Sequence, residues 1–204
     1  MSHLHIPDGV LPPWLWLGGF VIFALILGLS FWRLKKEVFL VKKMPILAAI
    51  TALMILGMSF PIVPIFYHLN LTVLAGIVLG PAAAVLAVFL SNLILAFFAH
   101  GGLTVIGLNS LILVFEAVFG WFLFKFVFRF ISRSFLRGFL AALPTLIVST
   151  FLAIGVVALG GADFRRFMEA SVALGALGWI LESSFTGFIV SYLKKIKPSI
   201  LTSE

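Results

Sequence analysis

Residues 69–99 read LNLTVLAGIVLGPAAAVLAVFLSNLILAFFA and contain no charged side chain. Apolar runs of this kind cross membranes as helices, and one span needs about 20 residues. The pair Gly80-Pro81 divides the run, because proline lacks the N–H of a helix interior and is tolerated only at a helix start. We therefore predict a short helix over 69–80, a tight turn or sharp kink, and a second helix over 81–99.

Further apolar runs lie on both sides of this stretch. They cover 14–32, 44–60, 104–130, 135–160 and 169–193. The 204 residues are 63% hydrophobic and only 10% charged, with a mean hydropathy of +1.26. This composition predicts an all-α, polytopic membrane protein with about seven transmembrane helices and no separate soluble domain. Within the single membrane domain 1–204 we distinguish an N-terminal segment 1–13, helices over 14–193 and a tail 194–204.

The distribution of basic residues predicts the orientation in the cell membrane. Of the 14 lysines and arginines, all except Arg165 and Arg166 follow the first, fifth or seventh predicted helix. Cytoplasmic loops carry such an excess, so the N-terminus is predicted outside and the C-terminus in the cytoplasm. On this topology the outer face carries all four histidines, which are His3, His5, His68 and His100.

Several function classes are disfavoured by the sequence. No GxxxxGK[ST] motif is present, so ATP-driven work would have to come from a partner subunit. There are no cysteines, which excludes thiolate metal sites, and neither HExxH nor an intramembrane aspartate pair supports an intramembrane hydrolase. The basic clusters lie between apolar runs, which argues against nucleic-acid binding. The first basic residue, Arg33, follows the first apolar run, so we expect the N-terminus to be retained.

The N-terminal sequence MSHLHIPDG places His3 and His5 close to a free amine. An amine, deprotonated backbone amides and an imidazole offer nitrogen ligands in a plane, which Ni(II) and Cu(II) prefer and some Co(II) sites use. His3 is third in the chain if Met1 is kept and second if Met1 is removed before Ser2, and both chelates stay open. The alternative is an exposed terminus with two incidental histidines. Pro7 favours a shaped segment because it fixes φ.

Other polar residues fall at the ends or inside the predicted helices. His68 lies at the outer mouth of the third helix, as either a functional group or an interfacial residue, and His100 suits a helix C-terminus. Glu116 and Glu182 fall near helix centres, where a charge is costly. They either relay protons or ions, or form structural hydrogen bonds with nearby polar side chains, for which we consider Asn92, Asn109 and Ser183.

Three segments together resemble a known family. They are HIPDGVLP at 5–12, His68-Leu69 with the small-residue run ending at Gly80-Pro81, and HGGLT at 100–104 with Gly107 and Asn109. The chain thus resembles the CbiM/NikM substrate-binding membrane subunits of energy-coupling-factor cobalt and nickel transporters. The resemblance covers residues 5 to about 125 closely and beyond that only the helix pattern.

The resemblance implies a near-planar nitrogen site for the metal. In the family it is built by the N-terminal amine, a backbone nitrogen and imidazole of the opening histidine, and a histidine before the third helix; His5 and His68 match these histidines. Relatives commonly begin Met-His, whereas here three residues precede Leu4-His5. We therefore expect His3 to take the amine-linked role, with His5 as a further ligand or a positioning residue. The expected ligand set is Met1, Ser2, His3, His5 and His68, supported by Asp8, Gly9, His100 and Asn109.

The resemblance also implies partners and a substrate. The partners would be a T-type transmembrane coupling subunit, cytoplasmic ATPase subunits and, in cobalt members, a small accessory membrane subunit. The transported substrate would be Co(II) or Ni(II). Planar nitrogen geometry favours nickel, whereas the Ile-Pro-Asp-Gly motif and the family's link to corrinoid synthesis favour cobalt. The chain itself is expected to be a transporter subunit and not an enzyme. The alternative is an organic-solute, vitamin-like subunit of the same transporter class.

Overall fold

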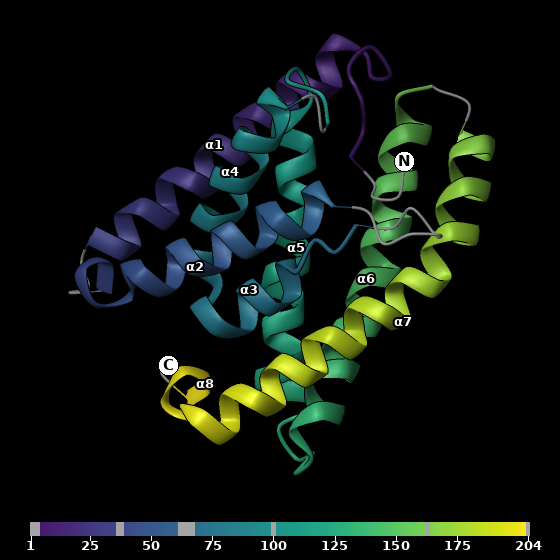
Figure 1. The fold of residues 1–204 in the computed structure, drawn as a ribbon. Coiled ribbons are helices and arrows are strands. Elements are labelled where there is room, and N and C mark those ends of the chain that lie inside the picture. Colours follow the sequence, from purple (N-terminus) through teal and green to yellow (C-terminus); the bar gives the residue numbers. More distant parts are fainter. Residues whose placement is uncertain (1–4, 36–38, 61–67, 99–100, 162–163, 203–204) are drawn as a thin grey trace.

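The computed structural model describes residues 5–35, 39–60, 68–98, 101–161 and 164–202, and the regular structure within them is helical throughout. Figure 1 shows the arrangement. The predicted all-α class is therefore confirmed. The helices are α1 (Pro13–Lys35), α2 (Phe39–Ser59), α3 (Thr72–Leu79), α4 (Pro81–Phe97), α5 (Ile106–Phe122), α6 (Ser134–Leu159), α7 (Phe164–Ile196) and α8 (Ser199–Thr202), and a π-helical turn, η1 (Leu123–Val127), continues α5.

The seven predicted helices differ in whether they are long enough to cross a membrane. Among the described residues, four helical segments are long and apolar enough to cross a membrane: α1, α5 with η1, α6 and the part of α7 from Gly175 to Ile196. The apolar parts of α2 and α4, Met44–Ser59 and Pro81–Phe97, are shorter. With 8 residues, α3 rises only about 12 Å. The seven helices are thus present without being seven equivalent spans, and α8 was not predicted.

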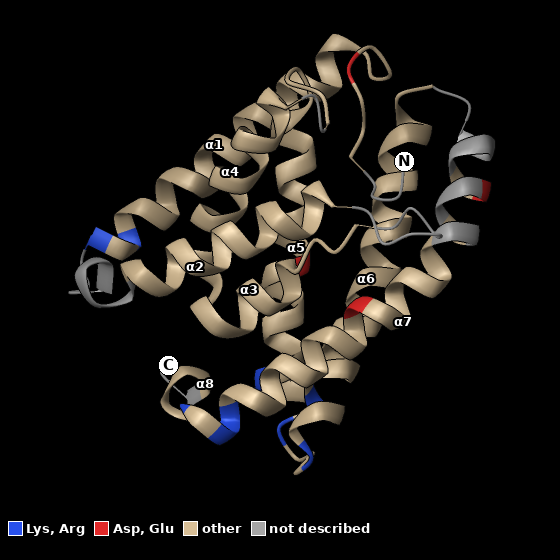
Figure 2. Cartoon of the chain, viewed as in Figure 1, with Lys and Arg blue, Asp and Glu red and all other residues tan. Residues whose placement is uncertain are grey.

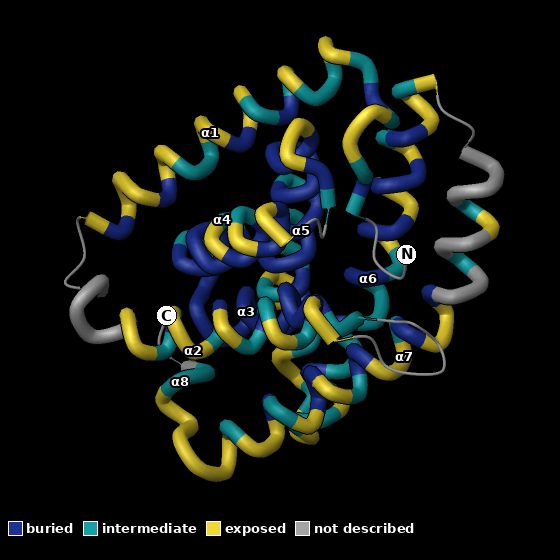
Figure 3. The backbone as a smooth tube through the Cα atoms, turned by 45° about the horizontal axis from the view of Figure 1, so that its top comes forward, coloured by how far each residue is buried: buried dark blue, intermediate teal, exposed yellow. Residues whose placement is uncertain are grey.

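The break at Gly80-Pro81 is confirmed. Gly80 ends α3 with φ 77° and ψ 166°, a backbone conformation that favours glycine, and Pro81 begins α4. All eight residues of α3 are buried, and the helix lies against α5, α4 and α2 in the centre of the molecule (Figure 3). The start of α3 is therefore held from several sides, and His68 comes four residues before it.

The outer helices expose apolar side chains, as a membrane protein requires. Helix α1 buries only Gly19, Phe23, Ser30 and Leu34 of its 23 residues. Large apolar side chains stay exposed on its other faces, among them Val21, Leu25 and Leu29 at 62%, 64% and 65%. A soluble monomer rarely leaves so continuous an apolar surface open. Lipid tails cover such a face without cost.

The described lysines and arginines lie away from the N-terminal segment. Figure 2 shows lysines and arginines at the end of α1 and around η1, the start of α6 and the end of α7. Acidic positions lie before the start of α1, near the middle of the molecule and on α7. This separation supports the predicted orientation, with the N-terminal segment outside, which remains a prediction.

Candidate metal-capture site at the N-terminal segment

The N-terminal segment is fixed to α5 through the backbone of Ile6. Asn109 accepts the N–H of Ile6 at 2.9 Å through Oδ1 and donates to its carbonyl at 3.1 Å through Nδ2. The Ile6 side chain is fully buried and packs in a cluster with Val105 of the preceding loop and Ala153 of α6. Asn109, which was predicted as a supporting residue, thus binds the segment through both backbone polar groups of Ile6. An undocked terminus would leave all of these groups without their partners.

Asp8 attaches the same segment to the loop before α5. Its carboxylate accepts the N–H of Leu103 at 3.0 Å, the N–H of Thr104 at 2.8 Å and the hydroxyl of Thr104. A Cβ at Gly102 would lie 2.4 Å from Asp8 Oδ1, so only glycine admits this contact. Gly9, with φ +81°, then turns the chain toward α1. The Pro-Asp-Gly sequence is therefore a docking element.

We expect the docking of Asp8 to depend on pH. The Thr104 hydroxyl bond, with the backbone N–H groups of Thr104 and Leu103, lowers the pKa of the exposed Asp8 below its ordinary 3.8. A lowered pKa contributes stability that is complete above 3.8 and is lost as pH falls through the folded value. Thermal unfolding of wild type and Asp8→Asn should therefore differ at neutral pH and converge in strong acid. A constant difference across this window would contradict the role of the carboxylate.

His5 lies where the segment meets this loop. Gly101 has φ +100°, and a Cβ there would come 3.4 Å from the Cβ of His5, so the two residues pack directly. The Gly102 N–H donates to the Ile6 carbonyl at 3.4 Å beside them. His5 is half-buried, and its Nε2 atom is buried. The N-terminal segment and the loop that begins at Gly101 thus lie against each other.

The structure describes only part of the expected ligand set. His68 is half-buried and leads into the turn before α3. Within the described ranges, no three histidine or acidic side chains gather as a metal-ligand cluster. The ligand set itself stays a prediction. The expected residues that lie outside the described ranges are Met1, Ser2, His3 and His100.

A buried polar cluster follows His68 directly. Asn70 donates from Nδ2 to Glu116 at 2.8 Å and from its backbone to Glu182 at 3.3 Å. Glu116 also accepts the Ser149 hydroxyl at 2.5 Å. Both carboxylates are hydrogen-bonded, but the predicted partners were wrong. Asn92 instead donates to Ser110, Asn109 holds Ile6, and the Ser183 hydroxyl has no hydrogen-bond partner among the described residues.

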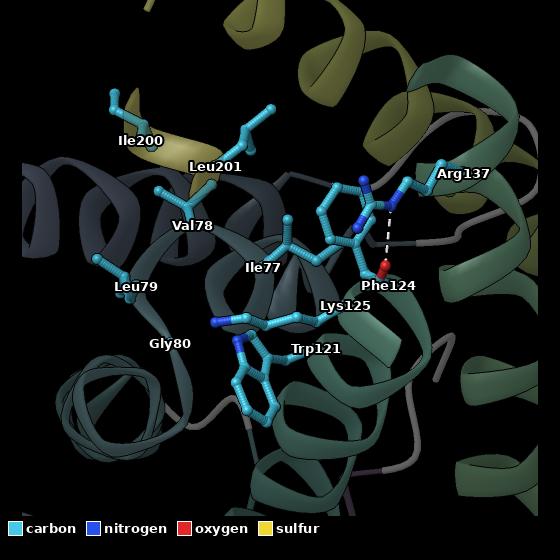
Figure 4. A pocket seen from close by; sticks show the side chains of 10 residues that line it. All are labelled: Ile77, Val78, Leu79, Gly80, Trp121, Phe124, Lys125, Arg137, Ile200 and Leu201. Carbon is cyan, nitrogen blue, oxygen red and sulfur yellow. Dashed lines mark hydrogen bonds between the residues drawn. The ribbon is translucent and has the colours of Figure 1, made fainter. Parts of the chain in front are cut away.

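The basic end of the molecule carries a different pocket, shown in Figure 4. Arg137 donates from Nε to the Phe124 carbonyl at 2.8 Å and stacks on the Phe124 ring, while Lys125 lies over Trp121. The two Arg137 contacts tie η1 to α6. The pocket contains none of the predicted site residues. It is lined by Ile77, Val78, Leu79, Gly80, Trp121, Phe124, Lys125, Arg137, Ile200 and Leu201.

Comparison with known proteins gives a family match and a shared fold. A family model described as CbiM, cobalt uptake substrate-specific transmembrane region, matches residues 5–200. A crystal structure of a transition metal transporter superposes with a TM-score of 0.84 and 20% identity over 94% of this chain and 93% of that chain. A truncated transition metal transporter gives 0.80 and 20% identity over 94% and 98%. No curated protein matches the sequence. The structural likeness shows a shared fold.

Proposed function

Because the chain belongs to the CbiM family, the substrate-specific transmembrane region of cobalt uptake, we propose that it captures Co(II) or Ni(II) at its outer face for import. It is a multi-pass membrane protein of a transporter family. The proposal makes it the substrate-binding subunit of an ATP-driven energy-coupling-factor importer. The chain carries no nucleotide-binding motif, so a T-type coupling subunit and ATPase subunits would supply the work, with a small accessory subunit if the cargo is cobalt.

The observation that carries the proposal is the docked N-terminal segment. Asn109 binds the backbone of Ile6, and the Asp8 carboxylate binds the loop before α5. His5, directly before Ile6, packs on Gly101. A terminus that is merely exposed and incidental does not bury an isoleucine completely or use a buried asparagine to read its backbone. Docking orders the segment before any metal binds, at a cost in conformational entropy. A segment ordered in this way can present metal ligands in a defined geometry.

The ligands we propose are nitrogen atoms. The terminal amine and His3 would form a chelate, and His5 and His68 would add imidazole nitrogen from the docked segment and from the turn before α3. Planar nitrogen donors suit Ni(II) and are used by some Co(II) sites. All of these nitrogens must be deprotonated to bind, so affinity should fall in acid.

Titration of the purified full chain tests the proposal. Mass spectrometry first establishes the mature N-terminal residue, and Co(II) and Ni(II) are then titrated separately by calorimetry. We expect one equivalent of metal to bind tightly. If neither ion binds, and a vitamin-like organic solute does, the subunit belongs to the organic-solute class and metal capture is wrong.

A further inference from the structure

The turn that follows His68 has a strained backbone. Leu71 has φ 57°, and it is the one non-glycine residue with positive φ in the described part of the chain. This left-handed conformation is unfavourable for leucine. Leu71 is also 2% exposed, so its side chain is fixed in the core. Such a conformation persists only where surrounding contacts over-determine it, and it often marks a functional site.

Hydrogen bonds to a backbone carbonyl of α2 and to a side chain of α7 hold the backbone of this turn. The Leu69 N–H donates to the Gly57 carbonyl of α2 at 3.1 Å. On the other side, Glu182 of α7 accepts the N–H of Leu71 at 2.9 Å and that of Asn70 at 3.3 Å, one through each oxygen. Glu182 is fully buried. Its carboxylate therefore satisfies two backbone donors that no regular helix bond would reach.

The Asn70 side chain adds two further helices to this arrangement. Its amide donates to Glu116 of α5 at 2.8 Å, and its Oδ1 accepts the N–H of Thr72 at 2.8 Å. The second oxygen of Glu116 accepts the hydroxyl of Ser149 on α6. Asn70 and Glu116 are each 3% exposed. The backbone beside His68 is thus connected to α2, α5, α6 and α7.

We propose that Glu182 and Glu116 are positioning residues that fix His68 by holding the turn formed by residues 69–71. The inference rests on the proposed function, because it takes His68 as a metal ligand. The amide of the next residue, Leu69, is already bonded to α2, so little freedom remains on the C-terminal side of His68. A planar nitrogen site requires correctly directed ligands, and groups behind the ligands commonly supply that direction.

Substitution by glutamine should affect the hydrogen bonds of the two carboxylates differently. Glu182 faces two backbone N–H groups, which can only donate, so the amide nitrogen of a glutamine would oppose one of them. Glu116 faces one amide donor and the hydroxyl of Ser149, and a hydroxyl can reverse its role and accept. Glutamine therefore breaks the hydrogen bonding at Glu182 and preserves it at Glu116.

The test compares Glu182→Gln with Glu116→Gln in the purified full chain. We expect Glu182→Gln to weaken Co(II) and Ni(II) binding by about 10- to 100-fold, the usual effect of losing an orienting partner, and to change the Co(II) absorption spectrum at saturation. Glu116→Gln should change both readouts much less than Glu182→Gln, because the bonds to Asn70 and Ser149 can persist. Equal losses in the two variants would mean that carboxylate charge matters directly, and no loss in either would mean that the turn does not position His68; both results overturn the inference.

A second variant and a ligand control complete the test. Helix content by circular dichroism shows whether Glu182→Gln folds; if it does not, Asn70→Ala releases Glu116 and Thr72 while leaving both backbone bonds to Glu182. We expect Asn70→Ala also to weaken binding and alter the spectrum. Unchanged affinity in His68→Ala would contradict the proposed ligand role itself. Lost affinity in His68→Ala with normal behaviour of Glu182→Gln and Asn70→Ala would contradict only the positioning role.

Discussion

Replacing His68 or His5 by alanine is expected to weaken Co(II) and Ni(II) binding by more than about 100-fold, which exceeds the usual effect of losing a group behind a ligand. The substitution His68→Ala would remove an imidazole that the turn before α3 presents. The substitution His5→Ala would remove either a second imidazole or the side chain that packs on Gly101 and shapes the segment. Calorimetric titration of each purified variant, with the mature N-terminus verified, measures the effect.

His100→Ala is the matched control for these variants. It also removes an imidazole from the predicted outer face, but His100 has a supporting place in the proposal and no ligand role. We expect a much smaller change in its metal affinity. If wild-type affinity survives in both His5→Ala and His68→Ala, the histidine site is wrong, whatever else the chain transports.

Asn109→Ala is expected to have the next largest effect. It removes the acceptor of the Ile6 N–H at 2.9 Å and leaves the Ile6 carbonyl only the 3.4 Å bond from Gly102. An unsatisfied buried backbone group costs about 1–3 kcal/mol, and each 1.4 kcal/mol is about tenfold in an equilibrium constant. Undocking of the segment should therefore weaken metal binding by about 10- to 100-fold, measured by the same titration.

Asn92→Ala tests whether that loss is specific. Asn92 is also a buried asparagine, on the neighbouring helix α4, and it donates to Ser110 of α5 at 3.0 Å. We expect it to lower thermal stability and to keep metal affinity near that of wild type. Equal losses of affinity in the two variants would indicate a general effect of core polar groups and not docking.

The features that the sequence predicted well depend on local chemistry. Proline cannot continue a helix, and the chain does break at Gly80-Pro81. The Pro7-Asp8-Gly9 sequence favours a turn, and the segment is docked there through Asp8. Apolar runs long enough to cross a membrane gave the helix positions within a few residues. None of these predictions required knowledge of which distant residues meet.

The features that the sequence missed depend on distant contacts. Residues 69–71 were predicted as helix, but α3 begins at Thr72, because Glu182, more than 100 positions later, holds Leu71 in a left-handed turn. Ser149 was not identified as the partner of Glu116 for the same reason. The strained Leu71 has no local signature, since leucine is common in helices. Only the packing of α3 against α5 and α7 reveals the cluster.

The most direct test of metal capture by N-terminal and histidine nitrogens is X-ray absorption spectroscopy of the purified full chain loaded with one equivalent of Co(II) or Ni(II). We expect a coordination shell of nitrogen ligands that includes imidazole, with the near-planar signature of such donors. A shell made only of oxygen ligands, or a spectrum that matches the hydrated ion, would contradict the proposed site.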